Sequence, residues 1–267
     1  MPGKGNIMDS VKALSIKRVT EEGKKDTEDT VTRERPLTII LNNQELVTLL
    51  CSPTGLNYLA VGFLSSEGLI KSKDEIKKIT VDDQRGVVRV ETGEDKEFVD
   101  IFKRFITSGC GRGASFYSAT DVTGQKIESR MEVPAQDVFT LVGKFQHRSH
   151  VFRTTGGVHS AALCEAKSIL LFSEDIGRHN AIDRIFGECL LRNIPADDRI
   201  IITSGRISSE ILLKVARRNI PIIISKSAPT DLGVRLADDL GITLLGFVRG
   251  KRMNAYSNDW RIARDGK

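Results

Sequence analysis

"RIIITSGRISSEILLKVARRNIPIIIS", residues 199–225, carries the pattern that decides the fold of this chain. Its two ends, RIIITS and PIIIS, are short and almost continuously apolar, which is typical of strands buried on both faces of a sheet. The stretch between them is compatible with a helix. Because parallel strands need a crossover connection, the pattern predicts a strand, a helix and a second strand parallel to the first.

The same alternation continues on both sides of this stretch. SILLFS at 168–173 precedes it and TLLGFV at 243–248 follows it, and a helix-compatible stretch follows each run except the last. AQDVFTLVGKFQHR, residues 135–148, has helical periodicity, with Val138, Leu141, Val142 and Phe145 on one face. The second half of the chain is therefore predicted to be a layered α/β domain built on parallel strands.

The loops that leave such strands lie along the carboxyl edge of the sheet, where ligands bind. These loops are SEDIGRHN (173–180), TSGRISS (203–209), SKSAPTD (225–231) and FVRGKR (247–252). Their basic side chains and the adjacent helix N-termini favour anions, so we expect a phosphorylated or nucleotide-like ligand. The candidate residues are Arg178, His179, Arg206, Lys226, Phe247, Val248, Arg249, Gly250, Lys251 and Arg252.

A structural explanation for these charges stays open at this point. Arg178 could pair with Glu174 or Asp175, and Arg206 with Glu210. The basic residues of 247–252 would then be exposed to solvent and would have no role in binding a ligand.

FRTTGGVHSAALCE, residues 152–165, adds a fifth candidate loop. Thr155, Gly156 and Gly157 would let backbone amides approach a ligand closely, and His159 would provide a hydrogen bond or transfer a proton. The alternative is that the glycine pair forms an ordinary turn and that the histidine is a structural donor.

The first half of the chain reads as a separate, smaller part. Residues 1–32 are polar and charged and are expected to be a tail or linker, with one strand near LSIKRV. Residues 33–130 are expected to form a small α+β domain that ends in a cysteine-containing loop, and residues 131–267 the α/β domain. The small domain includes a helix with Leu56, Leu59, Ala60, Phe63 and Leu64 on its apolar face, followed by the strand candidates EIKKITVDD, GVVRVET and KEFVDIFKRFI.

Composition excludes several classes of protein. The net charge of +5 comes from 40 basic and 35 acidic residues that are interspersed, and no basic block or aromatic–basic stripe indicates a nucleic-acid surface. Neither an apolar signal core nor a membrane-spanning run is present, so we expect a soluble, cytoplasmic protein that does not bind membranes and whose thiols are reduced.

The four cysteines, at 51, 110, 164 and 189, show no CxxC motif, and no zinc site or disulfide framework is expected. Cys51, Cys164 and Cys189 lie in apolar segments and read as small hydrophobic residues. Cys110 is different, because ITSGCGRGASF (106–116) surrounds it with glycines and places Arg112 nearby. Such surroundings favour a reactive thiolate, and sulfur transfer asks only for exposure, a low pKa and reach.

Taken together, these motifs resemble the formate dehydrogenase accessory sulfurtransferases, the FdhD family. The resemblance runs from about Glu34 to Tyr256, through ERPLTIILNN, SPTGLNYLAVGFLSSEGLI, TSGCG, FRTTGGVHSAAL, EDIGRHNAIDRIFG, SGRISSEILLKVA, SAPTDLGVRLADDLGITLLGF and RGKRMNAY. It implies a protein that receives sulfur from a cysteine desulfurase and delivers it to the molybdenum, or tungsten, bis(molybdopterin guanine dinucleotide) of formate dehydrogenase. It also implies a cytidine-deaminase-like α/β domain joined to the smaller one.

The resemblance assigns roles to individual positions. Cys110 matches the family's persulfide cysteine, and residues 247–252 match its cofactor-binding segment. The TTGGVH, EDIGRHN and SGR loops match its other nucleotide-facing motifs. One departure is that Gly113 stands where many members carry a second cysteine, so Cys110 would act alone.

Two competing functions can be weighed. Zinc deaminases need an H-x-E motif and a P-C-x-x-C motif, and VHSAAL has neither the glutamate nor a following PCxxC. A cofactor-binding chaperone without sulfur chemistry remains open, with Cys110 only a loop residue. A two-ended, nearly symmetric ligand would also suit a homodimer.

Overall fold

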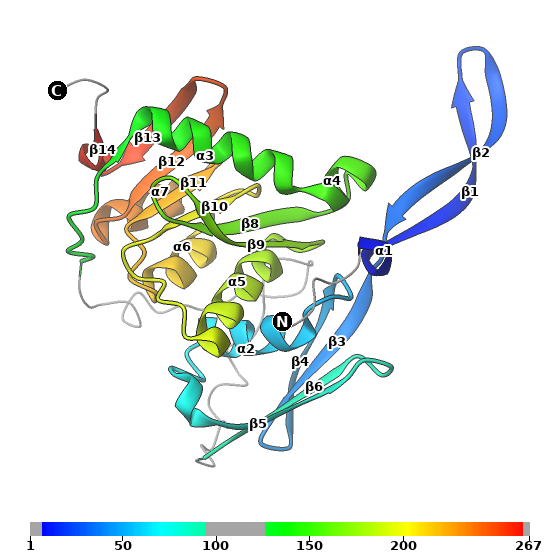
Figure 1. The fold of residues 1–267 in the computed structure, drawn as a ribbon, viewed down its shortest axis with the longest axis horizontal. Helices are drawn as coiled ribbons and strands as arrows, with labels where there is room; N and C mark the ends of the chain where they lie inside the picture. The colour runs from blue at the N-terminus through cyan, green and yellow to red at the C-terminus, as the bar shows by residue number, and fades with distance from the viewer. Residues whose placement is uncertain (1–6, 94–125, 264–267) are drawn as a thin grey trace.

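The computed structural model describes residues 7–93 and 126–263. A mixed six-stranded sheet forms the centre of the larger lobe (Figure 1). In spatial order its strands are β13 (Arg252–Ser257), β12 (Thr243–Arg249), β11 (Ile222–Ser225), β10 (Ile200–Thr203), β8 (His159–Cys164) and β9 (Ile169–Asp175). β10, β11 and β12 are parallel neighbours, as their apolar sequences predicted.

β8 corrects two predictions, that residues 152–165 form a loop and that the strand at 168–173 is one of the parallel strands. It lies between β9 and β10 and is antiparallel to both. Ala161 and Leu163 pack on one face of the sheet, and Ala162 and Cys164 pack on the other, all fully buried. A short run that is apolar on both faces gains most from a central position, which explains its insertion.

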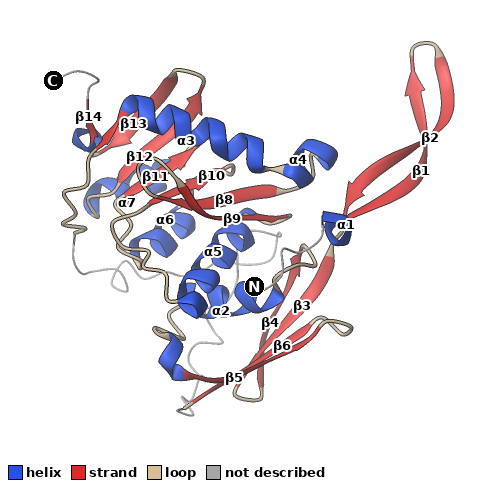
Figure 2. Cartoon of the chain, in the orientation of Figure 1, coloured by secondary structure: helices blue, strands red, loops and turns tan. Residues whose placement is uncertain are grey.

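Helices cover both faces of this sheet (Figure 2). On one face, α5 (Arg178–Arg192), α6 (Ser209–Ala216) and α7 (Asp231–Asp239) share a buried core with the strands. On the other face lies α3 (Ala135–Arg148), whose predicted apolar face of Val138, Leu141, Val142 and Phe145 is buried as expected. No helix among the described residues has the length and apolar character needed to cross a membrane.

Short elements complete the larger lobe. α4 (His150–Thr155) follows α3 directly, and β7 (Val133–Pro134) pairs with β14 (Ile262–Ala263). Between β13 and β14, the 3-10 helix Asp259–Arg261 buries the side chain of Arg261, which donates to the carbonyl oxygens of Gly241 and Ser129 at 2.7 and 3.0 Å.

The smaller lobe is a four-stranded sheet with one helix against it. Its strands, in spatial order, are β4 (Gln44–Cys51), β3 (Arg35–Leu41), β6 (Val87–Thr92) and β5 (Ile76–Asp82). The helix is α2 (Leu56–Ser66), and a 3-10 turn, Lys73–Glu75, leads into β5. The expected strand KEFVDIFKRFI, at 96–106, and the boundary at residue 130 stay predictions, because residues 94–125 lie outside the described part of the chain.

α2 and α5 hold the two lobes together by an unusually close helix contact. A Cβ atom added to Gly62 of α2 would lie 1.7 Å from the Asp183 carbonyl oxygen, and one added to Gly187 of α5 would lie 1.9 Å from the Tyr58 carbonyl oxygen. Leu190 of α5 also belongs to the apolar core of the smaller lobe. The lobes therefore share a packed interface rather than a flexible linker.

The N-terminal region corrects another expectation. Residues 11–32, predicted as a polar tail with one strand, form a hairpin of β1 (Val11–Thr20) and β2 (Gly23–Thr32) that extends from the body, preceded by α1 (Ile7–Ser10) (Figure 1). Lys17 and Asp26 face each other across the strands and form an ion pair at 2.7 Å, whereas Arg18 and Lys25, the next pair along, carry like charges. The mixed charges that suggested a polar tail therefore lie along two paired strands of an exposed hairpin.

Candidate functional site

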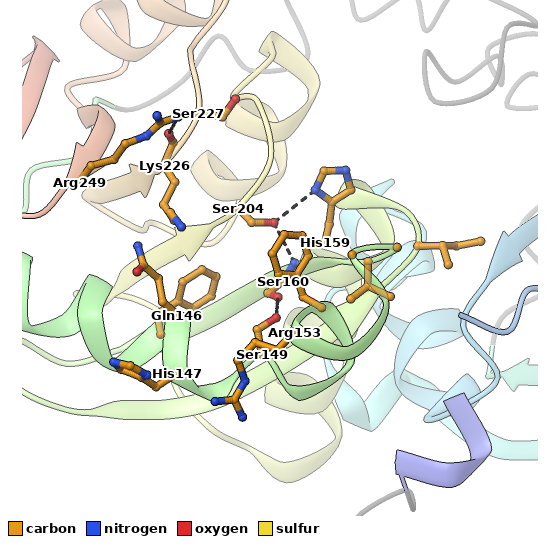
Figure 3. Close-up of a pocket in the computed structure, with 16 residues that line it drawn as sticks. Gln146, His147, Ser149, Arg153, His159, Ser160, Ser204, Lys226, Ser227 and Arg249 are labelled. Atoms are coloured by element: carbon orange, nitrogen blue, oxygen red, sulfur yellow. Dashed lines mark hydrogen bonds between the residues drawn. The ribbon is translucent and has the colours of Figure 1, made fainter. Parts of the chain in front are cut away.

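A cavity of about 750 Å³ lies at the edge of the large sheet where β8 begins and where β9, β10, β11 and β12 end. Parallel neighbours place their carboxyl ends together, which is why the loops after these strands meet here. Figure 3 shows the polar side chains around the cavity. The lining residues are Phe145, Gln146, His147, Ser149, Phe152, Arg153, Gly156, Gly157, Val158, His159, Ser160, Ile176, Ser204, Lys226, Ser227 and Arg249.

The imidazole of His159 lines this cavity and is held by a contact with Ser204. Its Nδ1 lies 3.2 Å from Ser204 Oγ, which also accepts a hydrogen bond from the Ser160 amide at 2.9 Å (Figure 3). The Ser204 hydroxyl has one donor and two acceptor positions, so its contact with His159 Nδ1 is compatible with either tautomer of the neutral ring. Burial and the positive charge of Arg178 lower the pKa of His159, so the imidazole is neutral at physiological pH.

Lys226 and Arg249 supply positive charge to the cavity. Burial and the charge of Arg249 lower the pKa of Lys226. No ion pair with a carboxylate is found for either side chain within residues 7–93 and 126–263. Two neighbouring cations without such a counterion favour an anionic ligand.

The end of α3 and the start of α4 provide lining residues that the sequence did not single out. Phe145 and Phe152 supply aromatic surface, and Gln146 and Arg153 supply hydrogen-bond donors. In the sequence, the only local sign that this region could line a site is the polar stretch QHRSH after the apolar face of α3. Nothing local indicated that β8 would bring this helix end to the mouth of the cavity.

The TTGG motif divides into a lining part and a structural part. Gly156 ends α4 with a φ of 67°, and Gly157 passes so close to the base of the hairpin that an added Cβ would lie 3.2 Å from Thr32 Cβ. The Thr155 hydroxyl is used internally, because it donates to the Val151 carbonyl at 2.8 Å and accepts from the Gly157 amide at 3.1 Å. Thus Gly156 and Gly157 line the cavity and Thr155 does not.

The FVRGKR segment is also divided by the fold, and only Arg249 lines the cavity. Phe247 has a φ of 51° and donates its amide to the Ser227 carbonyl at 3.2 Å. Val248 is fully buried in the core, so its side chain does not face a ligand. Gly250 and Lys251 form the turn to β13, where Arg252 is exposed. Whether these residues bind a cofactor stays a prediction.

The EDIGRHN loop is mostly structural. Asp175 pairs with Arg184 at 2.6 Å, and Glu174 accepts from Ser149 Oγ at 2.6 Å, so neither carboxylate pairs with Arg178. The Nε of Arg178 is buried without a hydrogen-bond partner among the described residues. Burial and the nearby charge of Arg206 lower the pKa of Arg178, and Arg206 itself is exposed.

His179 does not line the cavity and instead contacts Glu210. Its Nε2 lies 3.6 Å from Glu210 Oε2, and its side chain is 17% exposed. Burial and the charges of Lys214 and Arg178 lower the pKa of His179 to about 3, in spite of the opposing effect of Glu210. The ring is neutral in the folded protein across the physiological range.

Three of the four cysteines are buried thiols, as predicted. Burial raises the pKa of Cys51 to about 11 and the pKa values of Cys164 and Cys189 to about 12. These thiols are unreactive at neutral pH. Cys110, the predicted sulfur-carrying residue, lies outside the described residues, as do Arg112 and Gly113. Within the described ranges, no cluster of three or more His, Cys, Asp or Glu side chains could hold a metal ion.

Comparison with known proteins gives a consistent result. Two of the most similar curated relatives are named sulfur carrier protein FdhD. The one from Bacillus pumilus is 46% identical over 237 residues, which cover 88% of this chain and 90% of that protein. The one from Bacillus subtilis is 45% identical over 241 residues, which cover 88% of this chain and 91% of that protein.

A solved structure shares the fold. The crystal structure of a candidate formate dehydrogenase accessory protein from Desulfotalea psychrophila superimposes with a TM-score of 0.77 at 26% sequence identity, covering 95% of this chain and 99% of that one. The family profile described as FdhD/NarQ matches residues 32–263, which include both lobes and every cavity-lining residue. Because the family profile matches most of the chain and two relatives are 46% and 45% identical over 88% of it, this chain belongs to the FdhD/NarQ family.

Proposed function

We propose that this protein is a cytoplasmic sulfur carrier for the maturation of formate dehydrogenase. Cys110 receives sulfur from the persulfide of a cysteine desulfurase and delivers it to a molybdenum or tungsten bis(molybdopterin guanine dinucleotide), which is bound as a substrate. The names of the relatives support the sulfur-carrier role, and the description of the solved relative supports the link to formate dehydrogenase.

The cavity is the observation that carries the proposed substrate class. Its volume of about 750 Å³ lies within the range of small-molecule sites. Lys226 and Arg249 suit phosphate oxygens, whereas the exposed ring of Phe152 offers a surface for a flat heterocycle. One guanine nucleotide end of the substrate would occupy one cavity. A homodimer would offer two such cavities to the two ends.

The proposed chemistry is balanced in two steps. In the first, the Cys110 thiolate attacks the terminal sulfur of the donor persulfide, a new S–S bond forms as the donor's S–S bond breaks, and the donor cysteine leaves as a thiolate. In the second, the S–S bond at Cys110 breaks and Cys110 is released as a thiolate. The transferred sulfur takes two electrons from the reduced metal of the substrate and remains on it as sulfide.

Mass spectrometry tests the first step. After incubation with a cysteine desulfurase and cysteine, we expect the peptide that contains Cys110 to gain the mass of one sulfur atom, and a reducing thiol to remove it. The peptides that contain Cys51, Cys164 and Cys189 should stay unmodified, because burial raises the pKa of all three thiols. Sulfur on these peptides but not on the Cys110 peptide would refute the assignment.

The Cys110→Ala variant separates sulfur transfer from the alternative of a cofactor-binding chaperone. We expect this variant to bind guanosine diphosphate normally and to leave formate dehydrogenase inactive. Full maturation with Cys110→Ala would refute the relay and favour the chaperone. Cys164→Ala is the control, since Cys164 is fully buried in the sheet core.

Guanosine diphosphate binding tests the cavity. We expect Lys226→Ala to weaken binding by about tenfold or more, because a charge-assisted contact to phosphate is lost. Lys144→Ala is the matched control: Lys144 lies on α3, is exposed, and donates to the Lys167 carbonyl at 3.0 Å rather than lining the cavity. If Lys226→Ala, Lys144→Ala and the unmodified protein bind guanosine diphosphate with equal affinity, the ligand does not bind in this cavity.

A further inference from the structure

A buried carboxylate joins the cavity wall to the smaller lobe. Asp175, the last residue of β9, is completely buried, and its Oδ2 accepts from Arg184 Nε at 2.8 Å and from Arg184 Nη2 at 2.6 Å. The same carboxylate accepts from the Ser52 amide of the smaller lobe at 3.2 Å and from the Gly177 amide at 2.9 Å. Two sequence motifs more than a hundred residues apart, SPTG and EDIGRHNAIDR, meet at this one group.

Arg184 extends this contact into the smaller lobe. Its Nη2 donates to the Ser52 carbonyl at 2.7 Å and its Nη1 donates to the Thr54 carbonyl. From the same helix, Asn180 Nδ2 donates to Asp175 Oδ1 and to the Leu50 carbonyl, both at 2.9 Å. The turn between β4 and α2 is thereby fixed to the start of α5.

The network reaches the cavity at two points. Ile176, a lining residue, donates its amide to Ser52 Oγ at 3.3 Å. His159 stands directly opposite Asp175 in the β8–β9 ladder. The strand pairing therefore places the backbones of His159 and Asp175 side by side, and the negative charge of Asp175 raises the pKa of His159 against the larger, lowering effects of burial and Arg178.

We propose that Asp175, Arg184 and Ser52 are positioning residues for the cavity: they fix Ile176 and His159 against the smaller lobe, so that this lobe sets the geometry of a site built on the larger one. None of the three lines the cavity. The nature of the ligand used below rests on the proposed function, whereas the positioning itself does not.

A second buried network at the same lobe interface provides a control. Asp183, which precedes Arg184 in the chain, pairs with Lys214 at 2.6 Å and accepts from Ser66 Oγ at 2.6 Å. These three residues are buried and none of them lines the cavity. Ser52 and Ser66, 3% and 1% exposed, can therefore be truncated in parallel.

The experiment measures guanosine diphosphate affinity and thermal stability in Ser52→Ala and Arg184→Lys. Ser66→Ala is the control. We expect Ser52→Ala and Arg184→Lys to weaken guanosine diphosphate binding by about tenfold, since small displacements of a site are costly. Ser66→Ala should lower thermal stability and leave the affinity unchanged. In the ligand-free protein, NMR titration should show that Asp175→Asn lowers the pKa of His159, while Ser66→Ala does not change it.

Three outcomes are distinguishable. If Ser52→Ala and Arg184→Lys lose only stability, as Ser66→Ala does, and the His159 titration is the same in Asp175→Asn, the positioning role is wrong. If Asp175→Asn does not fold, the Ser52→Ala affinity alone decides the question. If the unmodified protein does not bind guanosine diphosphate, the proposed ligand class fails, and the pKa of His159 in Ser52→Ala and Arg184→Lys still tests the positioning: no change from the unmodified protein refutes it.

Discussion

Arg178 and Arg184 lie on the same helix, but only Arg184 has a guanidinium that is fully used in structural hydrogen bonds. Arg184 is 5% exposed, and its guanidinium is saturated by Asp175 and by carbonyl groups of the smaller lobe. Arg178 keeps a buried Nε without a partner among the described residues. Residue type and spacing marked Arg178 as a candidate and gave no sign of the role of Arg184. Arg184 joins Asp175, nine positions away, to carbonyl groups of the smaller lobe about 130 positions away.

His179 leads to a prediction about pH. In the folded protein its pKa is about 3, whereas an unfolded chain takes up the proton near pH 6.5. Between these values the unfolded state binds more protons, so stability is unaffected above pH 6.5 and falls as the pH decreases towards 3. At pH 5 the penalty from this residue should be about 2 kcal/mol.

Urea unfolding at pH 7.5 and pH 5 measures this penalty. In His179→Gln the loss of stability on acidification should be smaller by about that amount, 2 kcal/mol. His147→Gln, which changes an exposed side chain, should behave like the unmodified protein. An unchanged pH dependence in His179→Gln would show that the ring is protonated in the folded state.

At the scale of elements, the contact between α2 and α5 depends on two glycines. Sequence periodicity identified the buried face of α2, but Gly62 lay within that face without any signal of its own. Its significance comes from the backbone of α5, which approaches so closely that a methyl group would overlap the Asp183 carbonyl oxygen at 1.7 Å. The approach of two backbones is a property of a pair of helices and cannot be read from either helix alone.

Gly62→Ala and Gly187→Ala should each destabilise the fold by about 3 kcal/mol or more, because backbone atoms rather than flexible side chains stand in the way. Gly143→Ala on α3 is the control. An added Cβ at Gly143 meets nothing within 4 Å, and alanine has a higher helix propensity, so this variant should be neutral or more stable by up to about 1 kcal/mol. Chemical denaturation checks all three, and equal stability of Gly62→Ala and Gly143→Ala would contradict the close contact.

At the scale of the whole molecule, the two lobes are joined by apolar and polar contacts together. Leu190 of the larger lobe completes the core of the smaller one. Arg217 and Arg218, which follow α6, donate to the Ser66 carbonyl and to Ser65 Oγ at the end of α2. Neither lobe buries its apolar surface fully without the other, which argues for one folding unit.

Calorimetry should therefore show a single unfolding transition with equal calorimetric and van 't Hoff enthalpies. Asp183→Asn leaves Lys214 without its closest carboxylate and should lower the stability of that one transition by about 3 kcal/mol rather than divide it. Two separate transitions in the unmodified protein would show that the lobes fold independently.

The sequence by itself determined the strands β9 to β12, the apolar faces of α2 and α3, the burial of three cysteines and the edge of the sheet where the loops meet. These features depend on local periodicity. Burial of the apolar side chains stabilises the same helix or strand whichever neighbours the segment packs against. The proposed role of Cys110 likewise rests on sequence, since it lies outside the described residues.

Only the tertiary structure decided the rest: the insertion of β8, the hairpin of residues 11–32, the contribution of Gln146 and Arg153 to the cavity, and the division of the candidate loops into lining and structural residues. The partner that a charged side chain contacts decides whether that side chain is structural or available to a ligand. Those partners come from strands and helices distant in the chain, so its role is fixed by the meeting of elements and not by its neighbours in sequence.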